Sequence, residues 1–234
     1  LFQFIVYRNT PDLAVVLGQQ QFEYLKIKFR KSFEHVVIPA GATEYEQGPK
    51  ESNLSRSEKI VFGYSGNIGE AHDAEFLISL AKQLDPEKHE LILRLYGAKA
   101  VYVKQKIAEI PVVQFREYLS LSEIASIDVN IATLLPGWHH ICVPSKAVTA
   151  ICGGSALLLN SLEDADNWRM FREAAWLVKA GTEYEKELRI ILQSIGRDEI
   201  DLKKSKAATL SAEITLLKKK SFQSLADFFI DAES

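Results

Sequence analysis

A short apolar run that leads through two glycines into an amphipathic pattern constrains the fold of this chain most. Residues 59–64 are apolar, with β-branched and aromatic side chains, which is typical of a buried strand. Gly66 and Gly69 follow, and residues 74–84 then carry apolar side chains at helical spacing behind Asp73, a suitable N-cap. This order of elements can hold a phosphate, because glycines let the backbone approach and a helix N-terminus favours negative charge. It also fits a tight turn that merely reverses the chain.

Strand-like and helix-like segments alternate after this first unit. We expect further strands at residues 91–96, 112–115, 128–134, 156–160 and 176–178. The expected helices between them cover residues 99–110, 120–127, 145–151 and 162–174. Strands that are apolar on both faces and alternate with helices predict an α/β fold with a doubly wound parallel sheet. Ligands bind such sheets outside the carboxyl ends of the strands, so the function must be sought in those loops.

The chain divides into three parts. Residues 1–42 include two short strand patterns around a basic amphipathic helix at 19–32. Residues 43–58 are polar and rich in turn-forming residues, which predicts a linker. Residues 59–234 form the main α/β domain, with charged helices from residue 183 onward. Because the chain begins at Leu1, we expect it to be a fragment.

Composition excludes several classes of protein. The 234 residues are 47% hydrophobic and 25% charged, as in an ordinary globular protein, and a net charge of −3 gives no argument for a nucleic-acid partner. Two cysteines without a Cys-x-x-Cys pair favour a reducing compartment over a disulfide framework or a zinc ribbon. No apolar run reaches the roughly 18 residues of a membrane span.

Residues 135–146 form the most unusual loop. Pro144 is suited to a helix start, with Ser145 as a candidate cap. Lys146 then lies at a helix N-terminus, where its charge opposes the dipole, so it is either solvated or meets an anion held there. His139 and its neighbours His140 and Cys142 could suggest a metal, but adjacent histidines usually point apart. We expect no metal, and instead expect one histidine to donate to a phosphate or sugar.

Several known catalytic signatures are absent. The chain contains neither a Gly-x-Ser-x-Gly elbow nor a Gly-x-x-x-x-Gly-Lys-Ser/Thr phosphate loop. The glycines at 63, 66 and 69 do not match the dinucleotide-binding fingerprint. An acidic cluster at the strand ends, which a response-regulator receiver would need, is also missing. The catalytic residues are therefore unknown at this stage.

Five segments together carry a resemblance to a known family. They are Tyr64-Ser-Gly-Asn-Ile-Gly69, Tyr96-Gly97, Val113 to Tyr118, Val143-Pro-Ser-Lys146 with the helix into Gly153-Gly154, and Ala175-Trp-Leu-Val-Lys-Ala-Gly181. The chain resembles the C-terminal, donor-binding domain of retaining GT-B glycosyltransferases, especially bacterial ones that build surface polysaccharides. The resemblance covers about residues 59–232 and implies a Rossmann-like fold. His35 to Ala42 is similar to the family's entry into its interdomain linker, so residues 1–42 would be the tail of a truncated N-terminal acceptor domain.

The resemblance also implies a binding site for a nucleotide-diphosphate sugar. Gly66 and Asn67 would face the diphosphate, with His72 and His139 as further donors. Arg116 to Tyr118 would border the base, and the ribose and diphosphate would lie along a helix face formed by Ser145, Lys146 and Thr149. Thr149 and His72 stand where many relatives have a glutamate and a lysine, and Asn67 stands where many have an arginine.

We therefore expect a hexosyl- or other glycosyltransferase that moves a sugar, with retention, from a nucleotide-diphosphate sugar to a glycan or lipid-linked acceptor. The missing N-terminal domain would bind the acceptor, and activity of this chain alone is doubtful. We expect no cofactor, no nucleic-acid partner, and a cytoplasmic location at the inner face of the membrane, reached through the missing half. Two alternatives remain open: a non-catalytic GT-B-like nucleotide-sugar-binding protein or subunit, and a nucleotide-sugar epimerase of the same fold.

Overall fold

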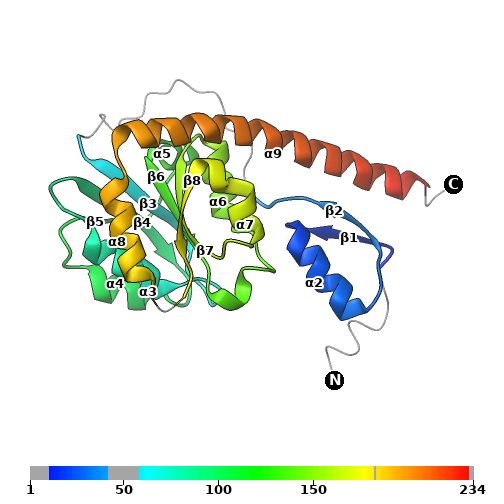
Figure 1. The fold of residues 1–234 in the computed structure, drawn as a ribbon, viewed down its shortest axis with the longest axis horizontal. Coiled ribbons are helices and arrows are strands. Elements are labelled where there is room, and N and C mark those ends of the chain that lie inside the picture. Colours follow the sequence, from blue (N-terminus) through cyan, green and yellow to red (C-terminus); the bar gives the residue numbers. More distant parts are fainter. Residues whose placement is uncertain (1–10, 42–57, 182, 232–234) are drawn as a thin grey trace.

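The apolar runs of the main domain form one parallel six-stranded sheet in the order β5-β4-β3-β6-β7-β8 (Figure 1). This computed structural model describes residues 11–41, 58–181 and 183–231. The strands are β3 (Ile60–Asn67), β4 (His89–Tyr96), β5 (Val113–Phe115), β6 (Val129–Thr133), β7 (Ala156–Ser161) and β8 (Ala175–Lys179). The predicted α/β fold with a doubly wound parallel sheet is confirmed.

Helices cover both faces of this sheet, which explains why its strands are continuously apolar. In β7, Leu158 packs on one face while Leu157 and Leu159 pack on the other, and all three are fully buried. A strand alternates its side chains between faces, so only a sheet that is covered twice needs apolar residues at every position.

The first face is covered by α3 (Ala74–Gln83), α4 (Ala100–Ile107) and α8 (Tyr184–Ser194). The second face is covered by α5 (Leu121–Ser126), α6 (Ser145–Cys152), α7 (Asp166–Phe171) and α9 (Arg197–Asp231). Short 3₁₀ turns lie at η1 (Pro136–Trp138) and η2 (Arg172–Ala174). Asp73 caps α3 by accepting a hydrogen bond from the backbone N–H of Phe76, as the sequence predicts. None of the helices in the described ranges has the length and apolar composition to cross a bilayer.

The strand order creates a crevice beside β3. The chain runs outward from β3 to β4 and β5, then returns to the other side of β3 and continues through β6 to β8. β3 pairs with β4 along all its eight residues, but it pairs with β6 only at Phe62 and Gly63. Beyond Gly63 the two strands part, and a ligand crevice forms at this kind of switch point.

Two predicted elements differ from the structure. β3 continues through Gly66 to Asn67, so the turn that follows is shorter than expected and Gly66 lies inside the strand, with φ of +148°. The helix expected at 162–174 begins only at Asp166 and tightens into η2. At this start the carboxylate of Asp166 accepts a hydrogen bond from the backbone N–H of Gln20, a contact that no local pattern reveals.

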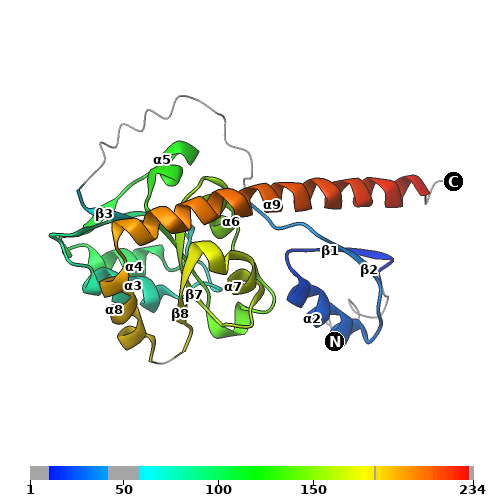
Figure 2. The ribbon, with the colours of Figure 1, turned by 45° about the horizontal axis from the view of Figure 1, so that its top comes forward.

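The N-terminal part forms its own small unit outside the main sheet. β1 (Leu13–Val16) and β2 (Glu34–Val37) pair in parallel, joined by α2 (Gln19–Phe29). Figures 1 and 2 both show this unit beside the main domain, beneath the C-terminal half of α9. Of the predicted boundary at 43–58, residues 43–57 lie outside the described residues.

α9 connects the two parts along its 35 residues. Its first half buries Ala207 and Ile214 against the main domain. Its second half contacts the N-terminal unit, where Lys218 donates to the carbonyl of Gly41 (2.9 Å) and Ser221 donates to the carbonyl of Val37 (2.8 Å). The helix therefore fixes the position of the N-terminal unit relative to the crevice.

The opposite end of the sheet is closed by a buried carboxylate. Asp128 is 8% exposed and precedes β6. Its Oδ2 accepts the backbone N–H of Val61 (3.0 Å) and a guanidinium N–H of Arg197 (2.8 Å). Its Oδ1 accepts from Lys204 at 2.8 Å, so one side chain joins β3, β6 and α9.

Replacing this carboxylate should therefore weaken the fold. We expect Asp128→Asn to lower the free energy of unfolding by about 2 kcal/mol, because two cations lose their charged partner in a largely buried position. Urea denaturation measures this change. Asp201→Asn, an exposed substitution on α9, should change stability by less than about 0.5 kcal/mol. Equal effects of the two variants would contradict the role of Asp128.

Candidate ligand-binding pocket

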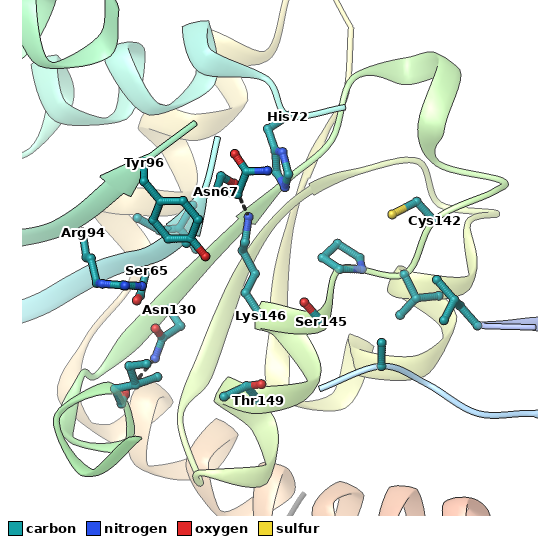
Figure 3. A pocket seen from close by; sticks show the side chains of 17 residues that line it. Ser65, Asn67, His72, Arg94, Tyr96, Asn130, Cys142, Ser145, Lys146 and Thr149 are labelled. Atoms are coloured by element: carbon teal, nitrogen blue, oxygen red, sulfur yellow. Dashed lines mark hydrogen bonds between the residues drawn. The ribbon is translucent and has the colours of Figure 1, made fainter. Parts of the chain in front are cut away.

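A pocket of about 500 Å³ occupies the crevice between β3 and β6. It is lined by the carboxyl ends of β3 and β4, by Asn130 and Ile131 of β6, by the start of α6 and by two residues of the N-terminal unit, Leu17 and Ala40. Its polar lining residues, labelled in Figure 3, are Ser65, Asn67, His72, Arg94, Tyr96, Asn130, Cys142, Ser145, Lys146 and Thr149. No carboxylate is among the described residues that line it.

Lys146 projects from the start of α6 into the middle of this pocket (Figure 3). Its Nζ donates to the hydroxyl of Tyr64 (2.6 Å) and to the carbonyl of Asn67 (3.2 Å), and lies 4.3 Å from the centre of the Tyr64 ring. Its Cε would lie 3.2 Å from a Cβ placed on Gly66. A side chain at Gly66 would therefore crowd Lys146, besides straining a backbone with φ of +148°.

Burial lowers the pKa of Lys146 to about 7. Desolvation disfavours its charged form, and the described residues offer it no carboxylate partner. Its contacts are to a neutral phenol, a ring face and a carbonyl. Burial also raises the pKa of Tyr64 well above its usual value, so that phenol stays protonated beside the amine. An anion in the pocket would supply the negative counter-charge that Lys146 lacks.

The loop between β3 and α3 is held in one shape by hydrogen bonds. The backbone N–H of Gly69 donates to Nδ1 of His72 (3.2 Å), so Nε2 carries the proton of the neutral ring. Burial and the nearby charges of Lys146 and Lys99 lower the pKa of His72 to about 4. Lys99 also donates to the carbonyls of Glu70 (3.1 Å) and His72 (2.6 Å). His72 is therefore an uncharged donor on a fixed loop.

The start of α6 forms the floor of the pocket. Ser145 and Thr149 lie one helical turn apart and line it together with Lys146 (Figure 3). Ser145 is not the N-cap that its sequence position suggests. Pro144 takes that place without a side-chain hydrogen bond, because its extended backbone already directs the chain into the first helical turn at Ser145.

Arg94 and Tyr96, from the end of β4, form one side of the pocket, and sequence reasoning missed Arg94 as a site residue. The guanidinium lies 4.9 Å from the ring centre of Tyr96 and 6.0 Å from that of Tyr118. Its Nε donates to the carbonyl of Glu117 (3.3 Å). Arg94 lies inside a strand, so only its register opposite Ser65 brings it to the crevice. The one sequence signal was a charged residue near the end of an otherwise apolar strand.

Three expected site residues do not line the pocket. Arg116 is exposed and its guanidinium turns back to the side chain of Gln114 (3.2 Å), because β5 is two strands away from the crevice. Tyr118 is 70% exposed and meets the site only through Arg94. His139 is fully buried, with Nδ1 3.5 Å from Oγ of Ser161, because η1 turns it toward the end of β7 instead of toward Lys146.

The paired histidines point apart, as their adjacency suggests. Burial lowers the pKa of His139 to about 4, whereas His140 is half exposed and faces Gln20 and Asp164. Over the described ranges, no group of three or more His, Cys, Asp or Glu side chains could hold a metal ion. Cys142 lies at the pocket edge, where burial raises the pKa of its thiol.

No protein-family model and no curated protein matches this sequence. Solved structures do match it. They include sucrose-phosphate synthase from Thermosynechococcus elongatus (TM-score 0.76, 13% identity, covering 98% of this chain and 62% of that one). HepE from Anabaena, in complex with UDP and glucose, has a TM-score of 0.75 and 15% identity, covering 96% and 66%. The pneumococcal O-GlcNAc transferase GtfA, in complex with UDP and GlcNAc, has a TM-score of 0.68 and 13% identity, covering 97% and 47%.

These similarities concern the fold. The chain spans between about half and two thirds of the length of these three structures. Within that span, its parallel sheet with helices on both faces matches the Rossmann-like domain of GT-B glycosyltransferases.

The burial of Lys146 should be visible in the pH dependence of stability. Between pH 7 and about 10 the unfolded chain keeps the lysine proton and the folded chain has lost it, so stability should rise with pH across this window. We expect wild type to gain stability relative to Lys146→Met as the pH rises from 7 to 9.5, measured by urea denaturation. The stability difference between wild type and Lys104→Met, a substitution at an exposed site on α4, should stay constant over the same pH range. A constant difference between wild type and Lys146→Met would contradict the assignment.

Proposed function

We propose that this chain is the donor-binding half of a retaining GT-B glycosyltransferase and that its pocket binds a nucleotide-diphosphate sugar. One observation carries the proposal: two basic side chains, Lys146 and Arg94, line a pocket at the switch point of the sheet, and no described carboxylate lines it. Such a pocket favours an anionic ligand, and its volume of about 500 Å³ lies within the range of small-molecule sites. Similar structures with bound UDP, HepE and GtfA, support the same ligand class.

The diphosphate would lie between the end of β3 and the start of α6. Gly66 leaves room there for the side chain of Lys146, whose ammonium form would neutralise phosphate charge. The helix N-terminus beside Ser145 adds a favourable dipole. His72 contributes a neutral N–H donor. Side chains thus supply the charge compensation, so no metal or cofactor enters the proposal.

The ribose would lie along the floor of the pocket, beside Ser145 and Thr149. Hydroxyl side chains can both donate to and accept from sugar hydroxyls. His139, buried behind the loop, supports that loop and does not touch the donor in this arrangement.

In the proposed reaction, the bond between the anomeric carbon and the diphosphate breaks, and the nucleoside diphosphate leaves with the electron pair. Lys146 would stabilise the charge that develops on this leaving group, the main electrostatic contribution that such a site can make. The acceptor hydroxyl, from a glycan or a lipid-linked sugar, forms the new bond on the same face of the donor, and its proton passes to the departing diphosphate. A further domain would bind that acceptor, at the inner face of the membrane in a bacterial cell.

A specific observation also favours a second candidate, a non-catalytic nucleotide-sugar-binding subunit. By the family resemblance, Thr149 stands where relatives carry a glutamate that would hold the ribose, and the neutral ring of His72 stands where they carry a lysine. Both differences would weaken donor binding. Transfer assays with the complete protein decide between the candidates, since only a transferase forms a glycoside whose anomeric configuration, measured by NMR, matches that of the donor. Interconversion of the sugar without any acceptor would indicate an epimerase instead.

Lys146 provides the direct test of donor binding. We expect Lys146→Ala to weaken the binding of UDP-glucose by roughly 1.5–3 kcal/mol, the scale of a charge-assisted hydrogen bond. Isothermal titration calorimetry measures the affinity. Because the pKa of Lys146 is about 7, wild-type affinity should fall above pH 7, where the amine must first take up a proton. Lys146→Arg should keep binding but lose this pH dependence. Equal affinity in wild type and Lys146→Ala would contradict the proposed phosphate site.

Thr149 provides the complementary test on the ribose. We expect Thr149→Glu to tighten the binding of UDP-glucose about tenfold, because a carboxylate accepts strong hydrogen bonds from ribose hydroxyls. Thr149→Gln, which is similar in size but uncharged, should tighten it less. If the glutamate variant binds more weakly than wild type with its melting temperature unchanged, the ribose does not lie along this face of α6.

A further inference from the structure

Arg94 is an unpaired guanidinium held in a defined position at the edge of the pocket. It is half buried and lines the pocket, yet the described residues place no carboxylate within ion-pair distance of it. The ring of Tyr96 (4.9 Å) and the carbonyl of Glu117 (3.3 Å from Nε) hold its plane, and the ring of Tyr118 lies 6.0 Å away. A charged group held without a protein counter-charge is suited to meet a ligand.

The guanidinium of Arg94 can donate hydrogen bonds but cannot accept them. A guanidinium has five N–H donors and no acceptor. In the described structure only Nε has a protein acceptor, the carbonyl of Glu117, so the donors on its two terminal nitrogens remain for a ligand. Because none of its nitrogens accepts a hydrogen bond, the group pairs only with acceptor atoms.

Arg94 lies at the opposite side of Tyr96 from the proposed phosphate site (Figure 3). Arg94 is opposite Ser65 in the sheet, whereas Lys146 bonds the carbonyl of Asn67, two residues further along β3. Two residues of a strand span about 7 Å. One extended ligand can therefore reach from Lys146 to Arg94, with its diphosphate at the first and its nucleobase at the second.

We propose that Arg94 reads the nucleobase of the donor and selects uracil and guanine, which carry a keto oxygen at O4 and O6, over cytosine and adenine. This inference rests on the proposed function of the pocket. Uracil offers O4, and guanine offers O6 and N7, as acceptors for the guanidinium fork. At the corresponding position cytosine and adenine carry an amino group, which is a donor and so repels the N–H groups of Arg94. Tyr96 is 50% exposed and positions Arg94 for this contact.

Calorimetry with UDP, GDP, CDP and ADP at one pH tests the inference. Wild type should bind UDP, GDP or both at least about tenfold more tightly than CDP and ADP, as one good guanidinium–base pair allows. Arg94→Gln should reduce this preference to less than about threefold by weakening the favoured nucleotides, because a glutamine accepts as readily as it donates. Lys146→Ala should instead weaken all four by a similar factor. Inorganic pyrophosphate, which has no base, should be weakened by Arg94→Gln no more than CDP and ADP are.

Lys104→Gln is the matched control, since it removes an exposed cation that also lies near an aromatic ring, Phe115 at 5.8 Å, but lies outside the pocket. It should leave the preference unchanged, and the melting temperature of each variant confirms that it is folded. An unchanged preference in Arg94→Gln, or a loss of preference in Arg116→Gln instead, would overturn the inference. Binding of all four nucleotides with equal affinity would also overturn it while leaving the proposed function standing. Failure of wild type to bind any of them would overturn both.

Discussion

The burial of one lysine at the point where two parallel strands part is the constraint on which the site depends. Lys146 leaves α6 and inserts its amine between the Tyr64 ring and the Asn67 carbonyl, on the side of β3 that β6 has left. Gly66 makes this possible, because any larger residue would meet the lysine chain. A buried amine without a carboxylate partner loses charge, and its pKa falls to about 7. A bound anion would favour the protonated form of Lys146 and so restore its positive charge.

The opposite end of the same strands explains why they part only on one side. Asp128 ties the backbone of Val61 to Arg197 and Lys204 of α9, so β3 and β6 are held together where they begin. Beyond Gly63 the described residues show no further pairing between these two strands, and the pocket lies there. α9 therefore affects the site twice: it closes the far end of the sheet, and it positions the unit that contributes Leu17 and Ala40 to the pocket wall.

The sequence predicted the α/β class, the parallel sheet and the segments that approach its carboxyl edge. These follow from local information, since apolar runs of strand length, helical periodicity, glycines and caps are set by near neighbours. The local pattern predicts Asp73 as a cap and marks the loops after residues 64 and 134 as candidate ligand-binding loops. The nature of the ligand also depended on family resemblance, because no catalytic motif identifies it.

Only the tertiary structure decided which side chains meet. Arg116 and His139 have the right chemistry and lie in the right loops, but strand order places the first two strands from the crevice, and η1 buries the second against Ser161. Arg94 reaches the pocket through its register opposite Ser65, and the pKa of Lys146 depends on burial among groups 82 and 79 positions away in the chain. Register and burial arise from pairing between distant segments, so a linear pattern shows the chemistry a loop carries but not its neighbours.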